Sequence, residues 1–183
     1  MPQFPKRYAD FVARLRVPSG FLLVIVFGWF SRPSAESLAW GLPIALTGLA
    51  LRAWAAGCLA KNQRLSTGGP YAYTRNPLYL GTLAVAAGLV VASRNPWLGG
   101  LFAAVFLFVY LPVIQLEEQH LRRLFPEYGE YAAAVPALRP RLTPGPRNNP
   151  HPFEIRLYLR NKEYQAGLGF LAGMLFLLWK VAV

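Results

Sequence analysis

Side chains that could bind a charged ligand gather in residues 69–81, which read Gly-Pro-Tyr-Ala-Tyr-Thr-Arg-Asn-Pro-Leu-Tyr-Leu-Gly. This segment lies between two long apolar stretches, and Glu117-Glu118-Gln119-His120-Leu121 follows the second stretch. Amides at a helix start, with an arginine and tyrosines, suit a ligand with anionic and aromatic parts. A carboxylate can bind a ribose hydroxyl, an ammonium or a sulfonium cation. Because ionisable groups at a membrane boundary usually serve a function, the two clusters predict one site.

A structural interpretation of the same residues is also open. Asn76-Pro77 is a typical start of a helix, with Asn as the cap and Pro at the first helical position. The tyrosines would then be interfacial anchors, and Arg75 would bind a lipid phosphate. Glu117 and Glu118 would begin a solvated helix face, and adjacent helical residues point about 100° apart.

Composition indicates a membrane protein. Of the 183 residues, 55% are hydrophobic and 15% are charged, and the mean hydropathy is +0.31, whereas soluble domains carry about 25% charged residues. The length favours a single membrane domain over residues 1–183. The single cysteine, Cys58, excludes an internal disulfide and suggests a buried thiol. The net charge of +11 is spread over loops, which favours an anionic membrane surface as partner rather than nucleic acid.

Five apolar segments predict an all-α, polytopic bundle of about five transmembrane helices. They cover residues 17–31, 37–60, 76–93, 95–116 and 164–180. A spanning helix needs about 17–25 residues, which the second, third and fourth segments provide. The first and last are short and would need snorkelling side chains at their ends.

The distribution of basic residues predicts the orientation. With five spans, fifteen of the 19 Lys and Arg lie on one side of the membrane. The positive-inside rule places that side, the N-terminus and both polar clusters in the cytoplasm, and the C-terminus outside. We expect a bacterial inner-membrane protein with a catalytic pocket on the cytoplasmic side. A signal peptide cleaved near Ala35 is less favoured, because its charged N-terminal region would be long and Pro33 would stand where a small residue is needed.

The predicted cytoplasmic segment, residues 117–163, has three parts. Apolar spacing over 113–134 predicts a helix that breaks near Phe125-Pro126. Residues 136–152 are proline-rich and predict an extended loop. Residues 153–162 form a basic amphipathic stretch that we expect in the headgroup plane.

Several enzyme classes lack their motifs here. There is no Gly-rich loop for a dinucleotide or a P-loop, and no Gly-x-Ser-x-Gly. Two histidines and one cysteine give no metal-ligand spacing, so we expect no metal site. Gly169-x-x-x-Gly173 predicts a close helix-packing face, which would also permit pairing between chains.

Arg52 interrupts the second apolar segment. An arginine in mid-span is costly unless it is paired, so we expect it to face the bundle interior. Its partner would be a carboxylate, a backbone carbonyl, or an anionic lipid or substrate group. Snorkelling toward Lys61 is the alternative, but it would require a long reach along the helix.

The two clusters resemble the isoprenylcysteine carboxyl methyltransferase and phospholipid methyltransferase superfamily. The resemblance runs from about residue 61 to 142. It rests on Gly69-Pro70-Tyr71, Arg75-Asn76-Pro77-x-Tyr79-x-Gly81, Glu117-Glu118-x-x-Leu121, Phe125, Tyr128 and Tyr131. Members are helical membrane enzymes, and the resemblance implies an S-adenosylmethionine-dependent methyltransferase. Its methyl acceptor would be a lipid or amphiphile that enters from the bilayer.

The resemblance also implies site residues. The implied catalytic residues are Arg75, Glu117 and Glu118. The implied cofactor-binding residues are Tyr71, Tyr73, Asn76, Pro77, Tyr79, Gly81, Glu118, His120 and Leu121. The isoprenylcysteine enzymes have His where this chain has Asn76, which cannot titrate near neutral pH. The Asn-Pro form looks more like bacterial members of the superfamily.

The acceptor and two other function classes stay open at this point. A carboxylate acceptor could be oriented by Arg75 without a base, whereas a lipid amine needs a base such as Glu117 or Glu118. A membrane reductase of the sterol-reductase type would use NADPH, and a non-catalytic bundle would bind lipid or a partner. Glu118→Gln should weaken cofactor binding more than Glu127→Gln, because Glu127 follows the predicted helix break.

Overall fold

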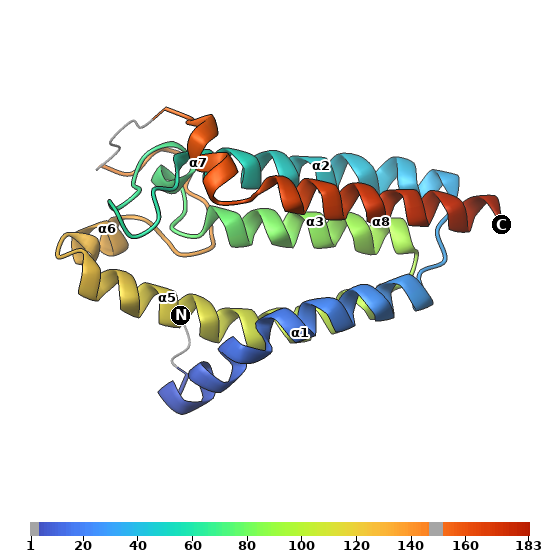
Figure 1. Ribbon diagram of the computed structural model, residues 1–183, viewed down its shortest axis with the longest axis horizontal. Coiled ribbons are helices and arrows are strands. Elements are labelled where there is room, and N and C mark those ends of the chain that lie inside the picture. The colour runs from blue at the N-terminus through green and yellow to red at the C-terminus, as the bar shows by residue number, and fades with distance from the viewer. Residues whose placement is uncertain (1–3, 147–151) are drawn as a thin grey trace. The chain divides into compact units, whose positions relative to one another are not determined.

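Every regular element among the described residues is helical (Figure 1). The computed structural model describes residues 4–146 and 152–183. Four of its helices are long and apolar enough to cross a membrane, namely α1 (Lys6–Phe30), α2 (Ala35–Cys58), a continuous helix Pro96–Leu124 and α8 (Tyr164–Ala182). The helix α3 (Pro77–Ser93) is apolar but shorter. These elements confirm the predicted class, an all-α polytopic membrane protein.

The first helix differs from its predicted segment. We expected an apolar span over residues 17–31, but α1 begins at Lys6 and has 25 residues. Lysine and arginine are good helix formers, so the basic residues before Val17 extend the helix although they interrupt the apolar pattern. Ala9 and Val12 are buried in this charged part. The helix α3 is the shortest of the five, with 17 residues.

The continuous helix Pro96–Leu124 contains a wider turn. It consists of α4 (Pro96–Val105), the π-helical turn η2 (Phe106–Tyr110) and α5 (Leu111–Leu124). Pro112 has no backbone N–H and therefore cannot donate to the carbonyl of Phe108. The hydroxyl of Tyr8, on α1, donates to that carbonyl at 2.7 Å. A side chain from another helix thus supplies a hydrogen bond that proline cannot make.

The chain forms two compact units. The first comprises Met1–Ala45, Ala86–Gln119 and Leu171–Val183, and the second comprises Leu46–Val85 and His120–Phe170. In the first unit, α1 contacts α4 and η2. The side chain of Lys180 donates to the carbonyls of Gly28 and Ser31, at 2.9 and 2.6 Å. Carbonyls at a helix C-terminus lack helical donors, so Lys180 stabilises the end of α1.

Glycines allow α2 and α3 to approach closely. In the first unit, a Cβ atom at Gly88 would lie 2.5 Å from the carbonyl oxygen of Gly41. In the second unit, a Cβ at Gly81 would lie 2.7 Å from the carbonyl oxygen of Gly48. Both distances are too short for real side-chain atoms, so glycine is required at the contact.

The predicted packing role of Gly169 and Gly173 is wrong for the described part of the chain. A Cβ atom added at either residue would have no described atom within 4 Å. Within the described residues, close helix packing at glycine occurs instead between α2 and α3.

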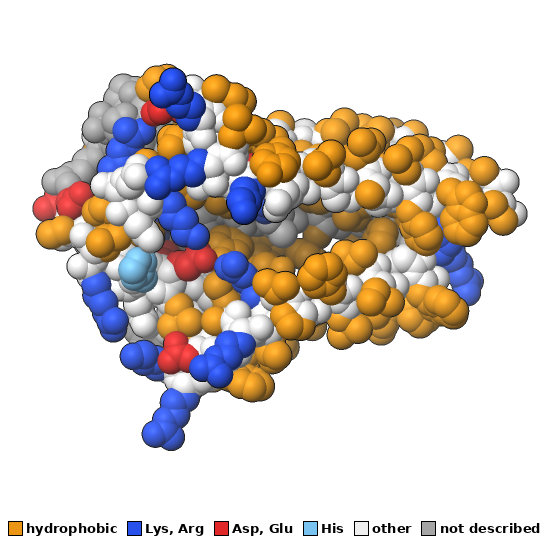
Figure 2. All heavy atoms as spheres, in the orientation of Figure 1, with side chains coloured by type: hydrophobic (Ala, Val, Ile, Leu, Met, Phe, Trp, Pro, Cys, Tyr) orange, Lys and Arg blue, Asp and Glu red, His pale blue; other side chains and the backbone are white. Residues whose placement is uncertain are grey.

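The second unit also holds α6, α7 and the start of α8. The predicted break near Phe125-Pro126 is confirmed, since α5 ends at Leu124 and α6 covers Tyr128–Ala134. Residues 135–146 have no regular structure, as expected for the first part of the proline-rich loop, and residues 147–151 lie outside the described residues. The short helix α7 (Ile155–Arg160) leads to α8. Figure 2 shows Lys and Arg side chains around α6 and α7, and hydrophobic side chains along α8.

Candidate active site

The segment with the Arg-Asn-Pro sequence runs from a short 3₁₀ turn into α3. The turn η1 covers Gly69–Ala72, and Gly69 has φ of +58°, a conformation that favours glycine. Pro77 is the first residue of α3, and the carbonyl of Asn76 accepts a hydrogen bond from the amide of Leu80 at 3.0 Å. Asn76 and Pro77 therefore start the helix as their sequence predicted.

This segment is bound to α6 and to the chain that follows α6. The hydroxyl of Tyr131 donates to the carbonyl of Tyr71 at 2.7 Å. The carbonyl of Ala137 accepts from the hydroxyl of Thr74 at 2.8 Å, and from the backbone and side-chain amides of Asn76 at 3.1 Å each. These contacts hold the backbone of the motif in one conformation.

Arg75 contributes to the same attachment. Its Nη1 donates to the carbonyl oxygens of Ala132 and Val135, at 2.6 and 3.1 Å. Both carbonyls lie at the C-terminal end of α6, where no following helical turn provides N–H donors. A guanidinium has five N–H donors in a fixed plane, so these two bonds orient the whole group. A ligand-binding role for Arg75 stays a prediction, but the group that would perform it is held in place.

We expect Arg75→Met to lower the free energy of unfolding by about 1–3 kcal/mol, because it leaves two partly buried carbonyls without their donor. Equilibrium unfolding in detergent micelles titrated with dodecyl sulfate, followed by far-UV circular dichroism, measures this change. Arg139→Met is the matched control, since it removes the same charge from an exposed position in the loop after α6. Equal effects of the two substitutions would contradict the assigned role.

The tyrosines of the motif occupy different environments. Tyr71 is buried in a cluster with Ala55 and Cys58, against which Leu78 packs. The burial of Cys58 agrees with the prediction. Tyr73 and Tyr79 are partly exposed, and Gly81 lies against α2. Tyr71 thus has a packing role, whereas the rings of Tyr73 and Tyr79 are more accessible to a ligand than the ring of Tyr71.

The second polar cluster, residues 117–121, divides between the two units. Glu117 and Glu118 belong to the first unit, and His120 and Leu121 to the second. Glu117 forms an ion pair with Arg16 at 3.4 Å, in which the two side chains are 47% and 44% exposed. Exposed pairs of this kind contribute about 0–1 kcal/mol, so the pair does little to fix the carboxylate. Glu118 is partly buried.

The residues after the glutamates connect the second motif to the first. His120 is exposed, whereas Leu121 packs on the cluster of Tyr128, Tyr131 and Val135. Because Tyr131 also holds Tyr71, and Arg75 donates to the carbonyl of Ala132, the second unit links Leu121 to the first cluster through α6.

Arg52 has the partner type that we expected. Its Nε and Nη2 donate to the two carboxylate oxygens of Glu163, at 2.6 and 3.0 Å. Its Nη1 contacts the carbonyl of Leu78 at 3.4 Å and the hydroxyl of Thr82. The Glu163 and Arg52 side chains are 10% and 23% exposed. The paired, inward role of Arg52 is confirmed, and Glu163 is a residue that the sequence analysis missed.

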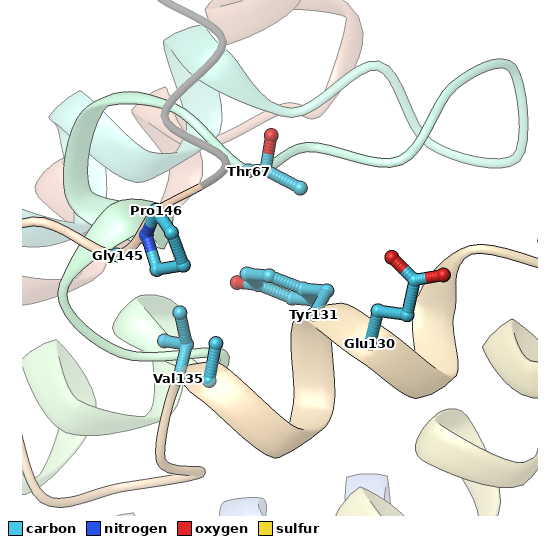
Figure 3. A pocket seen from close by; sticks show the side chains of 7 residues that line it. Thr67, Glu130, Tyr131, Val135, Gly145 and Pro146 are labelled. Atoms are coloured by element: carbon cyan, nitrogen blue, oxygen red, sulfur yellow. The ribbon is translucent and has the colours of Figure 1, made fainter.

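A pocket of about 180 Å³ lies beside α6 (Figure 3). Figure 3 shows Thr67 and Pro146 facing Tyr131 and Val135, with Glu130 at the edge. None of the predicted site residues lines this cavity. In the described residues there is also no group of three or more His, Cys, Asp or Glu that could hold a metal ion.

Comparisons with curated proteins give two bacterial relatives. The cobalt-zinc-cadmium resistance protein CzcN of Cupriavidus metallidurans is 36% identical over 105 residues, which are 56% of this chain and 47% of the relative. The nickel-cobalt-cadmium resistance protein NccN of Alcaligenes xylosoxydans xylosoxydans is 35% identical over 105 residues, covering 56% and 48%. The chain thus spans about half the length of the curated relatives it matches. No solved structure matches the chain.

A family comparison covers both motifs. The family described as "Phospholipid methyltransferase" matches residues 16–128, which is more than half of the chain and includes Arg75, Asn76, Pro77 and the glutamate pair. This match confirms the resemblance that the two clusters indicated. The chain belongs to the phospholipid methyltransferase family of membrane proteins.

Proposed function

We propose that this protein is an S-adenosylmethionine-dependent methyltransferase acting on a lipid-like or amphiphilic acceptor that enters from the bilayer. The observation that carries the proposal is the family match over residues 16–128, which includes both polar clusters. The helices of membrane-spanning length support an acceptor that is itself held in the membrane.

The chemistry of the available side chains fits the cofactor. Glu118 and Glu117 offer carboxylates for ribose hydroxyls or for the amino group. Arg75, held by the carbonyls of Ala132 and Val135, offers donors for a carboxylate. The partly exposed rings of Tyr73 and Tyr79 suit a sulfonium cation or an aromatic base.

We assign the cofactor contacts to both motifs. The proposed cofactor-binding residues are Tyr71, Tyr73, Asn76, Pro77, Tyr79, Gly81, Glu118, His120 and Leu121. Pro77 and Gly81 would act through the shape of the helix start, and Tyr71 through its place in the core cluster that Leu78 packs on.

S-adenosylmethionine, when bound, supplies an electrophilic methyl group. In-line displacement needs close alignment and exclusion of water, so positioning provides much of the catalysis. For a carboxylate acceptor, Arg75 orients the acceptor oxygens and no base is required. For an amine acceptor, Glu117 or Glu118 accepts the proton that the nitrogen loses.

We place the protein in a bacterial inner membrane, with its N-terminus and active site in the cytoplasm and its C-terminus outside. The excess of Lys and Arg in the loops on one side supports this orientation, and both relatives are bacterial. The proposed partners are membrane lipids and the amphiphilic acceptor, without nucleic acid.

Calorimetric titration of the detergent-purified protein with S-adenosylhomocysteine, and with NADPH in parallel, tests the proposal. We expect binding of S-adenosylhomocysteine in the micromolar range and no binding of NADPH. Binding of NADPH alone would move the protein to the reductase class. If a folded, monodisperse sample bound neither, the non-catalytic bundle would be the better description.

A further inference from the structure

Hydrogen bonds fix the short helix α7 to the C-terminal end of α2, and all the residues that form them belong to the second unit. The side-chain amide of Asn161, which follows α7, donates to the carbonyls of Ala56 and Leu59 at 2.9 Å each. The backbone amide of Glu154, which precedes α7, donates to the carbonyl of Gly57 at 2.9 Å. These carbonyls belong to the last turn of α2 and to the residue after it, where helical donors are missing. The end of α2 therefore sets the position of α7.

This position is at a membrane boundary. The helix α2 has 24 residues and is long and apolar enough to cross a membrane. At 1.5 Å per residue it is about 36 Å long, whereas the hydrocarbon core of a bilayer is about 30 Å thick. A spanning α2 therefore ends among the lipid headgroups, and α7, which is bound to that end, lies at the same depth.

The accessible face of α7 is apolar on one side and basic on the other. Ile155 and Leu159, which are 57% and 54% exposed, stand about 40° apart around the helix axis. Arg156 and Arg160, both exposed, form a second pair about 100° further round. Leu157, on the opposite side, is buried. This arrangement is typical of helices that lie in the interface, with apolar side chains toward the acyl chains and basic ones toward the headgroups.

The loop 59–68 lies beside the basic side of α7. In the orientation of its side-chain amide that satisfies both groups, Gln63 accepts a hydrogen bond from Nη1 of Arg160 at 2.8 Å. Arg64 forms an ion pair with Glu154 at 3.2 Å. The loop and α7 thus form one surface, which we call the basic surface, with the charged residues Lys61, Arg64, Glu154, Arg156, Arg160 and Lys162.

The cations of the basic surface outnumber its carboxylates. It has five Lys and Arg and one glutamate, Glu154, which Arg64 already binds. The next carboxylate along the chain, Glu163, is bound by Arg52. Within the described part of the chain, no ion pair is formed by the remaining four cations of the surface, Lys61, Arg156, Arg160 and Lys162. The surface is therefore complementary to an anion.

The location of the basic surface points to a lipid phosphate as that anion. A guanidinium offers planar N–H donors that match phosphate oxygens. Phosphatidylglycerol carries a phosphate and no ammonium, so its headgroup is negative, whereas the ammonium of phosphatidylcholine cancels its phosphate charge. Basic residues at a membrane surface are attracted to the negative lipids.

We propose that α7 and the loop 59–68 form a binding surface for anionic phospholipids, in which Arg156 and Arg160 bind the headgroup phosphate. The side chains of Ile155 and Leu159 contact the acyl chains of the same lipid. The helix α7 lies beyond residues 16–128, which the family match covers. The surface contains none of the proposed cofactor-binding residues, so the proposal does not depend on which reaction the protein catalyses.

Native mass spectrometry of the full chain in detergent tests the headgroup preference. The protein is titrated with phosphatidylglycerol or with phosphatidylcholine of the same acyl chains, and we expect the first phosphatidylglycerol to bind at least about tenfold more tightly. Equal affinity for the two lipids would overturn the proposal. Soluble glycerol 1-phosphate at the same concentration should not displace phosphatidylglycerol, because it lacks acyl chains. Displacement would indicate a site for a soluble phosphate and would also overturn the proposal.

A double substitution on α7 tests the location of the lipid. Arg156→Gln/Arg160→Gln should weaken phosphatidylglycerol binding by about tenfold or more and leave phosphatidylcholine binding within about twofold. Arg7→Gln/Arg14→Gln is the matched control, because it removes the same charge from two exposed positions on another helix, α1. Glutamine and arginine have similar helix propensities, so both double variants should fold. An equal loss of phosphatidylglycerol affinity in both would contradict the proposal, since net charge alone would then explain the binding.

A nitroxide spin label tests the apolar side of α7 independently of charge. In phosphatidylglycerol nanodiscs, a label on Leu159→Cys should be more accessible to oxygen than to a water-soluble nickel chelate. Leu142→Cys is the control, because Leu142 is fully exposed in the loop after α6 and its label should favour the chelate. Both variants carry Cys58→Ala, so that each has a single thiol. The same ratio of accessibilities at the two positions would show that α7 does not lie against the bilayer, and the proposal would be wrong.

Discussion

Replacing Arg52 with methionine is expected to lower the free energy of unfolding by about 3–5 kcal/mol, because it leaves the Glu163 carboxylate without its counter-charge. The carboxylate is 10% exposed and receives two hydrogen bonds from the guanidinium. The same substitution removes the contacts to the carbonyl of Leu78 and the hydroxyl of Thr82 on α3. Dodecyl sulfate titration in mixed micelles measures the change.

Two further variants separate the ion pair from other effects. Arg32→Met removes an arginine from an exposed position between α1 and α2 and should change stability little. The double variant Arg52→Met/Glu163→Met removes both charges, and it should recover a large part of the loss, because a buried pair replaced by apolar residues is often neutral. A double variant as unstable as the sum of the single ones would rule out a pairwise interaction.

Glu118→Gln should weaken the binding of S-adenosylhomocysteine about ten- to a hundredfold, because a hydrogen bond to a charged group contributes about 1.5–3 kcal/mol. This expectation rests on the proposed function. Glu118 is partly buried on α5, so its carboxylate is less hydrated than a fully exposed one. Isothermal titration calorimetry of the purified variant gives the dissociation constant.

Glu127→Gln provides the comparison for Glu118. Glu127 is exposed and stands at the start of α6, so its neutralisation should leave the dissociation constant within about twofold. Arg16→Gln adds a second comparison, because Arg16 forms an exposed ion pair with Glu117, the residue next to Glu118. If Glu118→Gln and Glu127→Gln had the same negligible effect on the dissociation constant, the result would contradict a cofactor-binding role of the glutamate pair.

Helix starts were predictable because their signals are local. Asn76-Pro77 was predicted to start a helix, and Pro77 is the first residue of α3. Asn95-Pro96 has the same residue types, and there the side chain of Asn95 accepts a hydrogen bond from the amide of Trp97 at 3.1 Å where α4 begins. The start of α1 was not predictable from apolar patterning, because its first turns carry Lys6 and Arg7 and are helical by propensity rather than by hydrophobicity.

The identity of long-range partners was not predictable. The cost of an unpaired charge in a span was enough to predict that Arg52 has a partner. Choosing Glu163 required knowing that residues 111 positions apart come together, and no local pattern carries that information. The attachment of Arg75 was missed for a related reason, since its acceptors are the backbone carbonyls of Ala132 and Val135, which every residue possesses.

The wider turn Phe106–Tyr110 has a consequence for every residue that follows it. A π-helical turn holds one residue more than the α-helical turn it replaces. Each residue advances an α-helix by about 100°, so the side chains from Leu111 onward are rotated by about that angle relative to a uniform helix. A helical wheel drawn through residues 96–124 with one period therefore assigns Glu117 and Glu118 to the wrong faces. Deleting one residue from this turn would rotate both carboxylates by about a quarter of a circle without changing either of them.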